Sequence, residues 1–102
     1  IYREWPLGSS AQHLDSFAIP STHQKPLLIG EFGAEKEDFG TVQSAATALR
    51  DLQVLSCSYG VKGWLAWTWD TSEQPGYYTV KEAGGAINGL LSPLARGNPC
   101  LP

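Results

Sequence analysis

The fold is decided by the stretch LLIGEFG at residues 27–33. Four apolar residues surround one carboxylate, Glu31, with Pro26 in front of the run and Gly33 behind it. A short apolar run between two such breakers is typical of a strand that is buried on both faces. A carboxylate near the end of such a strand must be paired or neutralised, because an unpaired buried charge is costly. We therefore expect Glu31 to be a catalytic carboxylate.

A second strand is predicted at residues 63–70, which read GWLAWTWD. Tryptophan and threonine favour pleated surfaces. Because side chains alternate along a strand, Leu65, Trp67 and Trp69 would share one face of it. Trp64 would lie on the other face, in the core under the last helix.

Between these strands the sequence predicts one long helix. Its apolar residues recur at helical spacing from residue 42 to residue 52, and the pattern extends to Tyr59. Thr41 is placed to cap its first turn, and Gly60 is placed to end it. Residues 34–40, which precede this helix, form an acidic and exposed loop in this interpretation.

The order of predicted elements assigns the chain to the α/β class. A short helix at residues 11–18 precedes the first strand, and a glycine-rich helix at residues 83–94 follows the second one. Strands that alternate with helices indicate parallel β/α units. Because two such strands would leave apolar edges unpaired, we expect the chain to be an incomplete part of a larger fold.

The composition excludes several classes of partner. The 102 residues are 42% hydrophobic and carry a net charge of −3, and no basic patch is visible, so we expect no nucleic acid partner. No apolar run reaches the roughly 18 residues that a membrane span needs, so we expect no membrane partner. The chain does not begin with Met. We expect it to be a processed or excised piece of a longer protein, or an incomplete sequence.

The two cysteines, Cys57 and Cys100, leave two alternatives open. They can form one disulfide that ties the C-terminal tail to the body, which would indicate a secreted or extracytoplasmic protein. They can instead be two separate thiols, one of them in a helix face. Their spacing does not fit a metal site, and we expect neither a metal nor a cofactor.

Glu31 and the tryptophans Trp67 and Trp69 all lie near the C-terminal ends of predicted strands. In a β/α barrel these ends form the active-site mouth. A carboxylate beside an aromatic surface is typical of glycosidases, because an indole packs against a sugar ring while the carboxylate works on the anomeric carbon. Trp5 follows a presumed earlier strand and is a third candidate for sugar contact, and Tyr77 can flank the same cleft.

The segment at residues 25–33 (KPLLIGEFG) resembles the seventh strand of clan A retaining glycoside hydrolases, as in glycoside hydrolase family 5. The segment at residues 63–69 (GWLAWTW) resembles the eighth strand of the same barrels, especially the cellulase-like and mannanase-like members. The resemblance implies that Glu31 is the nucleophile and that a tryptophan of the second segment is the sugar platform. It also implies that residues 1–102 are the C-terminal segment, about strands six to eight, of one (β/α)8 TIM-barrel domain that cleaves β-linked polysaccharide or oligosaccharide.

One part of the family pattern is missing. Retaining glycosidases need a second carboxylate as acid/base, which in this family sits on the fourth strand after an asparagine. The sequence contains no Asn-Glu pair. We therefore expect the chain alone to be inactive. Two alternatives remain: a non-catalytic carbohydrate-binding relative that uses Trp5, Trp67 and Trp69, and a structural barrel fragment that associates with the missing part or with itself.

Overall fold

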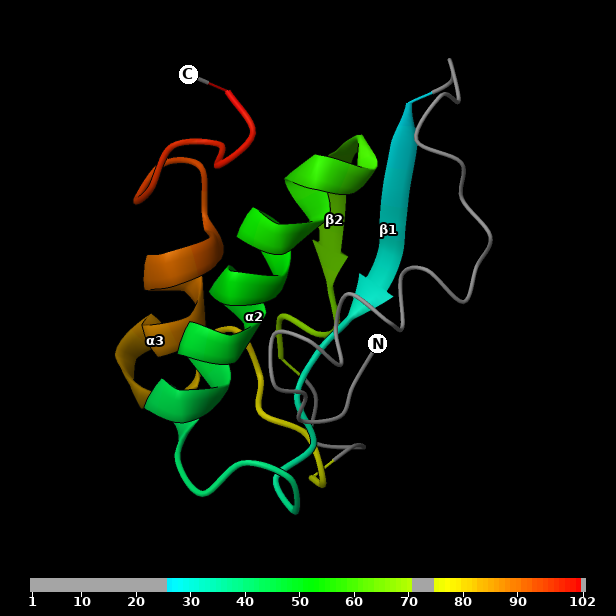
Figure 1. The fold of residues 1–102 in the computed structure, drawn as a ribbon. Helices are drawn as coiled ribbons and strands as arrows, with labels where there is room; N and C mark the ends of the chain where they lie inside the picture. The colour runs from blue at the N-terminus through cyan, green and yellow to red at the C-terminus, as the bar shows by residue number, and fades with distance from the viewer. Residues whose placement is uncertain (1–25, 71–74, 102) are drawn as a thin grey trace.

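The computed structural model describes residues 26–70 and 75–101. This part is a mixed α/β unit with two α-helices and a two-stranded parallel sheet (Figure 1). Trp5 and the helix predicted at residues 11–18 lie outside the described residues. The elements are, in chain order, β1 (Leu27–Phe32), α2 (Val42–Ser56), the short 3-10 helix η1 (Cys57–Tyr59), β2 (Val61–Ala66) and α3 (Glu82–Leu91).

The two strands form a parallel pair, and the helix α2 connects one to the other, as the alternating pattern predicts. Leu27 pairs with Val61 near the start of the ladder, and Phe32 pairs with Ala66 at its end. The register is irregular just before that end. Between the pairs Ile29–Trp64 and Phe32–Ala66, β1 has two residues, Gly30 and Glu31, whereas β2 has only one.

The local signals that bound α2 are confirmed. Thr41 has extended backbone angles, its hydroxyl accepts a hydrogen bond from the Ser44 N–H (3.0 Å), and Ser44 bonds back to the Thr41 N–H. This is a capping box, which satisfies two backbone donors that the first turn leaves unpaired. At the other end the α-helix tightens into η1 and stops at Gly60, whose φ of 80° is left-handed and suits glycine.

The predicted bounds of the second strand are partly wrong. β2 ends at Ala66, four residues before the predicted end. Among the described residues its partner is β1, which itself ends at Phe32, so no further ladder is available beyond the Phe32–Ala66 pair. The chain then bends toward residues 79–81. The period-two argument therefore does not extend to Trp67 and Trp69.

The core lies on one side of the sheet, where both α2 and α3 are found (Figure 1). It contains apolar side chains from all four main elements and two loops: Ile29, Phe32, Ala34, Phe39, Ala45, Ala46, Leu49, Leu52, Val61, Val80 and Ile87. Trp64 packs against this cluster, and its indole N–H donates to the Ser56 hydroxyl (2.9 Å). Trp64 therefore packs at the edge of the core and is only partly buried, rather than being a fully buried core residue.

The prediction that β1 is buried on both faces is wrong for the described residues. Leu28 is 69% exposed and Leu65 is 64% exposed. Leu28 lies over Gly63, where an added Cβ would come within 2.8 Å of its Cδ2. The sheet therefore has one face covered by helices and a second, apolar face that is exposed, which we call the open face (Leu28, Gly63 and Leu65).

The last helix differs from the prediction at both its start and its end. Ala83, Gly84 and Gly85 have positive φ angles, so the regular helix begins after them and ends at Leu91. Glycine populates these angles at little cost, which explains why a glycine pair marks this kink. Before α3, Tyr77 forms a single antiparallel bridge with Glu35.

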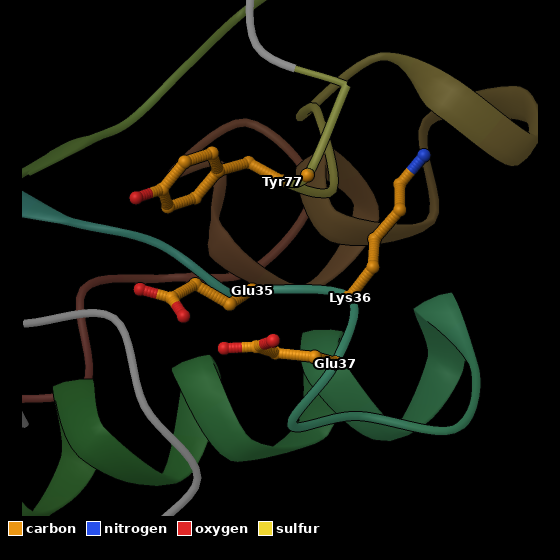
Figure 2. Close-up of a pocket in the computed structure, with 5 residues that line it drawn as sticks. Glu35, Lys36, Glu37 and Tyr77 are labelled. Atoms are coloured by element: carbon orange, nitrogen blue, oxygen red, sulfur yellow. The ribbon is translucent and has the colours of Figure 1, made fainter.

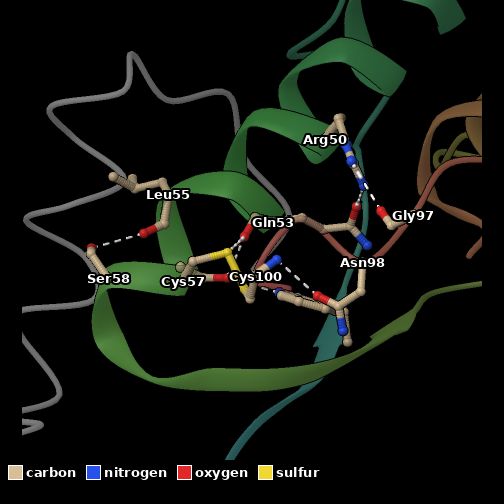
Figure 3. The surroundings of a disulfide bond; sticks show 10 residues. Arg50, Gln53, Leu55, Cys57, Ser58, Gly97, Asn98 and Cys100 are labelled. Carbon is tan, nitrogen blue, oxygen red and sulfur yellow. Dashed lines mark hydrogen bonds between the residues drawn. A yellow bond between two sulfur atoms is a disulfide. The ribbon is translucent and has the colours of Figure 1, made fainter. Parts of the chain in front are cut away.

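The two cysteines form a disulfide (Figure 3). It joins the end of α2 to the C-terminal tail across a sequence separation of 43 residues. Arg50 strengthens the same connection, because its guanidinium donates to the Gly97 carbonyl (3.2 Å) and to the Gln53 side chain (3.1 Å). The alternative of two free thiols is thereby excluded in this structure.

Candidate functional site

The candidate site lies at the C-terminal edge of the two strands. Because β1 and β2 are parallel, both strands end at this edge. The Trp67 N–H donates to the Phe32 carbonyl (2.7 Å), which joins the two strand ends directly. Glu31 precedes Phe32, so the structure brings the predicted carboxylate and the first predicted tryptophan to neighbouring strand ends.

Glu31 is exposed rather than buried. Water can solvate an exposed carboxylate, so the argument that Glu31 needs a special partner because it is buried does not hold here. Its position is nevertheless unusual, because it lies at the register irregularity of the ladder. Such irregularities re-aim side chains and are frequent beside active sites.

Trp67 and Trp69 follow β2 in a bent segment. Their exposed fractions are 37% and 60%, so Trp69 offers the larger free aromatic surface. The backbone around them is held by the residues just before α3. The Val80 N–H donates to the Thr68 carbonyl (2.9 Å), and the Lys81 N–H donates to the Trp69 carbonyl (3.2 Å).

The loops that follow the two strands are joined to each other. The Lys36 N–H donates to the Gly76 carbonyl (2.8 Å), and the Tyr78 N–H donates to the Ala34 carbonyl (2.9 Å). The Tyr78 hydroxyl also donates to the Phe39 carbonyl (3.0 Å). These contacts hold the loop after β1 and the segment before α3 together as one rim beside the strand ends.

This rim contains a hollow of about 290 Å³ lined by Glu35, Lys36, Glu37, Gly76 and Tyr77. Figure 2 shows the side chains of Glu35, Glu37 and Tyr77 extending to the same side, while Lys36 points away from them. The Lys36 ammonium instead lies 3.5 Å from a Glu82 carboxylate oxygen. The acidic loop is therefore more structured than the sequence predicts, although Glu37 is exposed as expected.

Among the described residues, no group of three or more His, Cys, Asp or Glu side chains is arranged to hold a metal ion. In residues 26–70 and 75–101, none of the helices is both long enough and apolar enough to cross a membrane.

Of the residues predicted for the site, the structure brings Glu31, Trp67 and Trp69 to one edge of the sheet. Trp5 lies outside the described residues. The sequence alone does not predict the backbone hydrogen bond from Lys81 to Trp69 or the ion pair between Lys81 and Asp70. The only sequence signal for them is opposite charge at Asp70 and Lys81, which is too common to be used alone.

Comparison of the chain with protein-family models, with curated proteins and with solved structures gives no significant match.

Proposed function

We propose that this chain supplies the nucleophile and the aromatic sugar platform of a retaining glycoside hydrolase that cleaves β-linked polysaccharide or oligosaccharide. The observation that carries the proposal is the hydrogen bond from the Trp67 N–H to the Phe32 carbonyl (2.7 Å). It links the end of the strand that bears Glu31 to the start of the segment that bears both tryptophans. A carboxylate and an exposed indole at one edge of a parallel sheet are the groups that this chemistry needs.

In this proposal Glu31 attacks the anomeric carbon and forms a covalent glycosyl-enzyme. A second carboxyl group, in its acid form, protonates the leaving oxygen as the glycosidic bond breaks. The carboxylate that remains then takes a proton from the water that releases the sugar. The apolar face of the sugar ring packs on Trp69, with Trp67 beside it. The second carboxylate comes from a part of the barrel outside these 102 residues, so the chain by itself is inactive.

The open face supports placing the chain in a closed barrel. Leu28 and Leu65 are largely exposed on the side of the sheet that the helices do not cover. In a (β/α)8 barrel the helices cover the outer face, and branched apolar side chains fill the interior. We assign the open face to the barrel interior and the chain to about the last three β/α units. The Cys57–Cys100 disulfide supports a secreted or extracytoplasmic location.

Covalent labelling tests the role of Glu31 in the complete enzyme. A 2-deoxy-2-fluoroglycoside with a good leaving group slows release of the sugar, so the glycosyl-enzyme accumulates on the nucleophile. We expect mass spectrometry to find one adduct, on the peptide that contains Glu31. Glu31→Gln should lose the adduct, and its kcat should fall by about 10³-fold or more, because the covalent step is removed.

Asp51→Asn is the matched control, since Asp51 is an exposed carboxylate of α2 that does not line the rim. It should keep the adduct and the rate. An adduct on another carboxylate, or an unchanged rate for Glu31→Gln, would overturn the assignment of the nucleophile.

The open face also favours a second candidate function, a structural piece that associates through this surface. An exposed apolar sheet face with unpaired strand edges promotes association. Light scattering on the isolated chain separates the candidates when it is combined with activity of the complete enzyme. A stable oligomer of the chain, together with a complete protein that neither binds nor cleaves polysaccharide, would favour the structural role.

A further inference from the structure

Lys81 contacts the Trp69 segment at two points. Its backbone N–H donates to the Trp69 carbonyl (3.2 Å), and its ammonium lies 2.6 Å from a carboxylate oxygen of Asp70. The preceding residue, Val80, donates to the Thr68 carbonyl (2.9 Å). Lys81 thus holds both the backbone of Trp69 and the side chain of the residue that follows it.

The segment from Trp67 to Asp70 is therefore fixed at both ends. At its start the Trp67 N–H is bonded to the Phe32 carbonyl of β1, and at its end Asp70 is bonded to Lys81. Between these points the Trp69 side chain is 60% exposed. Packing restrains such a side chain weakly, so its orientation depends on how firmly its backbone is held.

The Lys81 side chain can pair with Asp70 because it does not cap α3. Lys81 directly precedes Glu82, the first residue of α3, and makes no side-chain cap hydrogen bond. Its removal should therefore leave the start of α3 intact while it releases Asp70.

We propose that Lys81, through Asp70, is a positioning residue that orients Trp69 for sugar binding. This inference rests on the proposed function for the identity of the ligand, a neutral sugar ring. Lys81 itself does not touch the sugar. Both charged side chains are about half exposed, at 56% and 50%, so the effect should be modest and sensitive to salt.

The test uses the complete enzyme with a soluble β-linked oligosaccharide. Lys81→Ala should raise KM by about threefold with kcat changed less than about twofold, because an exposed ion pair is worth a few-fold change in an equilibrium constant. Lys81→Arg should restore KM, since it keeps the charge and the reach. Asp70→Asn should raise KM as Lys81→Ala does, and the double variant should add no further loss.

Two controls show that the effect comes from the ion pair. Lys62→Ala, which removes an exposed lysine from β2, should leave KM unchanged. At about 1 M salt, where charges are screened within about 3 Å, wild type and Lys81→Ala should converge. A loss that neither Arg nor salt alters would indicate a merely structural role and would overturn the inference.

Quenching by acrylamide gives a readout that needs no sugar. The emission of Trp69 is obtained by difference from Trp69→Phe, and we expect it to be quenched more readily in Lys81→Ala than in the wild type. If the complete protein neither binds nor cleaves sugar, the proposed function fails, and increased quenching still shows that Lys81 orients Trp69. If sugar is cleaved but Lys81→Ala changes neither KM nor quenching, the positioning role fails while the proposed function stands.

Discussion

The two ends of the parallel sheet are held in different ways. Near the start of β2, η1 is tied to the C-terminal tail by the Cys57–Cys100 disulfide, and Arg50 bonds the same tail. At the other end, Glu31 and Trp69 are exposed and the surrounding loops are held by hydrogen bonds and ion pairs. The disulfide therefore lies at the opposite end of the sheet from the candidate site. β/α barrels likewise separate stability at one face from catalysis at the other.

Among the changes that test this difference between the two ends, removal of the disulfide should have the largest effect. Cys57→Ser with Cys100→Ser should lower the free energy of unfolding by about 2–4 kcal/mol, because the bridge closes a long loop in the unfolded chain. Thermal unfolding measures the loss, and wild type in reductant is the control. Where the variant is still folded, its affinity for sugar should equal that of the wild type. A parallel loss of affinity would show that the two ends are not independent.

Trp69→Ala should weaken sugar binding and leave stability almost unchanged, which is the reverse of the result expected for the disulfide variant. We expect about a tenfold weaker affinity for oligosaccharide, equivalent to about 1.4 kcal/mol, because the proposed aromatic platform is lost. The free energy of unfolding should change by less than about 0.5 kcal/mol, since the side chain is mostly exposed. Calorimetric titration and thermal unfolding provide the two values, and Trp69→Phe should lie between wild type and Trp69→Ala. Unchanged binding would remove Trp69 from the site.

The smallest effect should come from the cap of α2, which begins near the candidate site. Thr41→Ala should lower the free energy of unfolding by about 1 kcal/mol, because the Ser44 N–H loses its acceptor. Sugar affinity should not change, since Thr41 belongs to the framework. Urea unfolding measures the loss, and Thr41→Ser, which keeps the hydroxyl, should restore stability. A fall in affinity would show that stability at this end cannot be separated from binding.

The sequence predicts best those features that depend on neighbouring residues. Thr41 and Gly60 mark the ends of the α2–η1 segment because capping and left-handed angles are local requirements. The end of β2 at Ala66 was not predictable in the same way, because it depends on where its partner β1 stops. Pairing of the two cysteines joins residues 43 positions apart, so local sequence does not decide it either.

The candidate site also contains some features that the sequence predicts and others that it does not. That Glu31 and Trp67 reach one edge follows from the parallel arrangement, which the alternating pattern predicts. The expected burial of Glu31 was wrong, because apolar neighbours in sequence do not show what covers a strand. Leu28 demonstrates this directly, since it belongs to the same apolar run and is largely exposed.

The hydrogen bonds between the two rim loops have a consequence for engineering. The Lys36 N–H and the Ala34 carbonyl are satisfied by Gly76 and Tyr78 of the other loop. Replacing either loop alone would leave these backbone groups without their hydrogen-bond partners. A graft of this rim into another protein must therefore transfer both loops together.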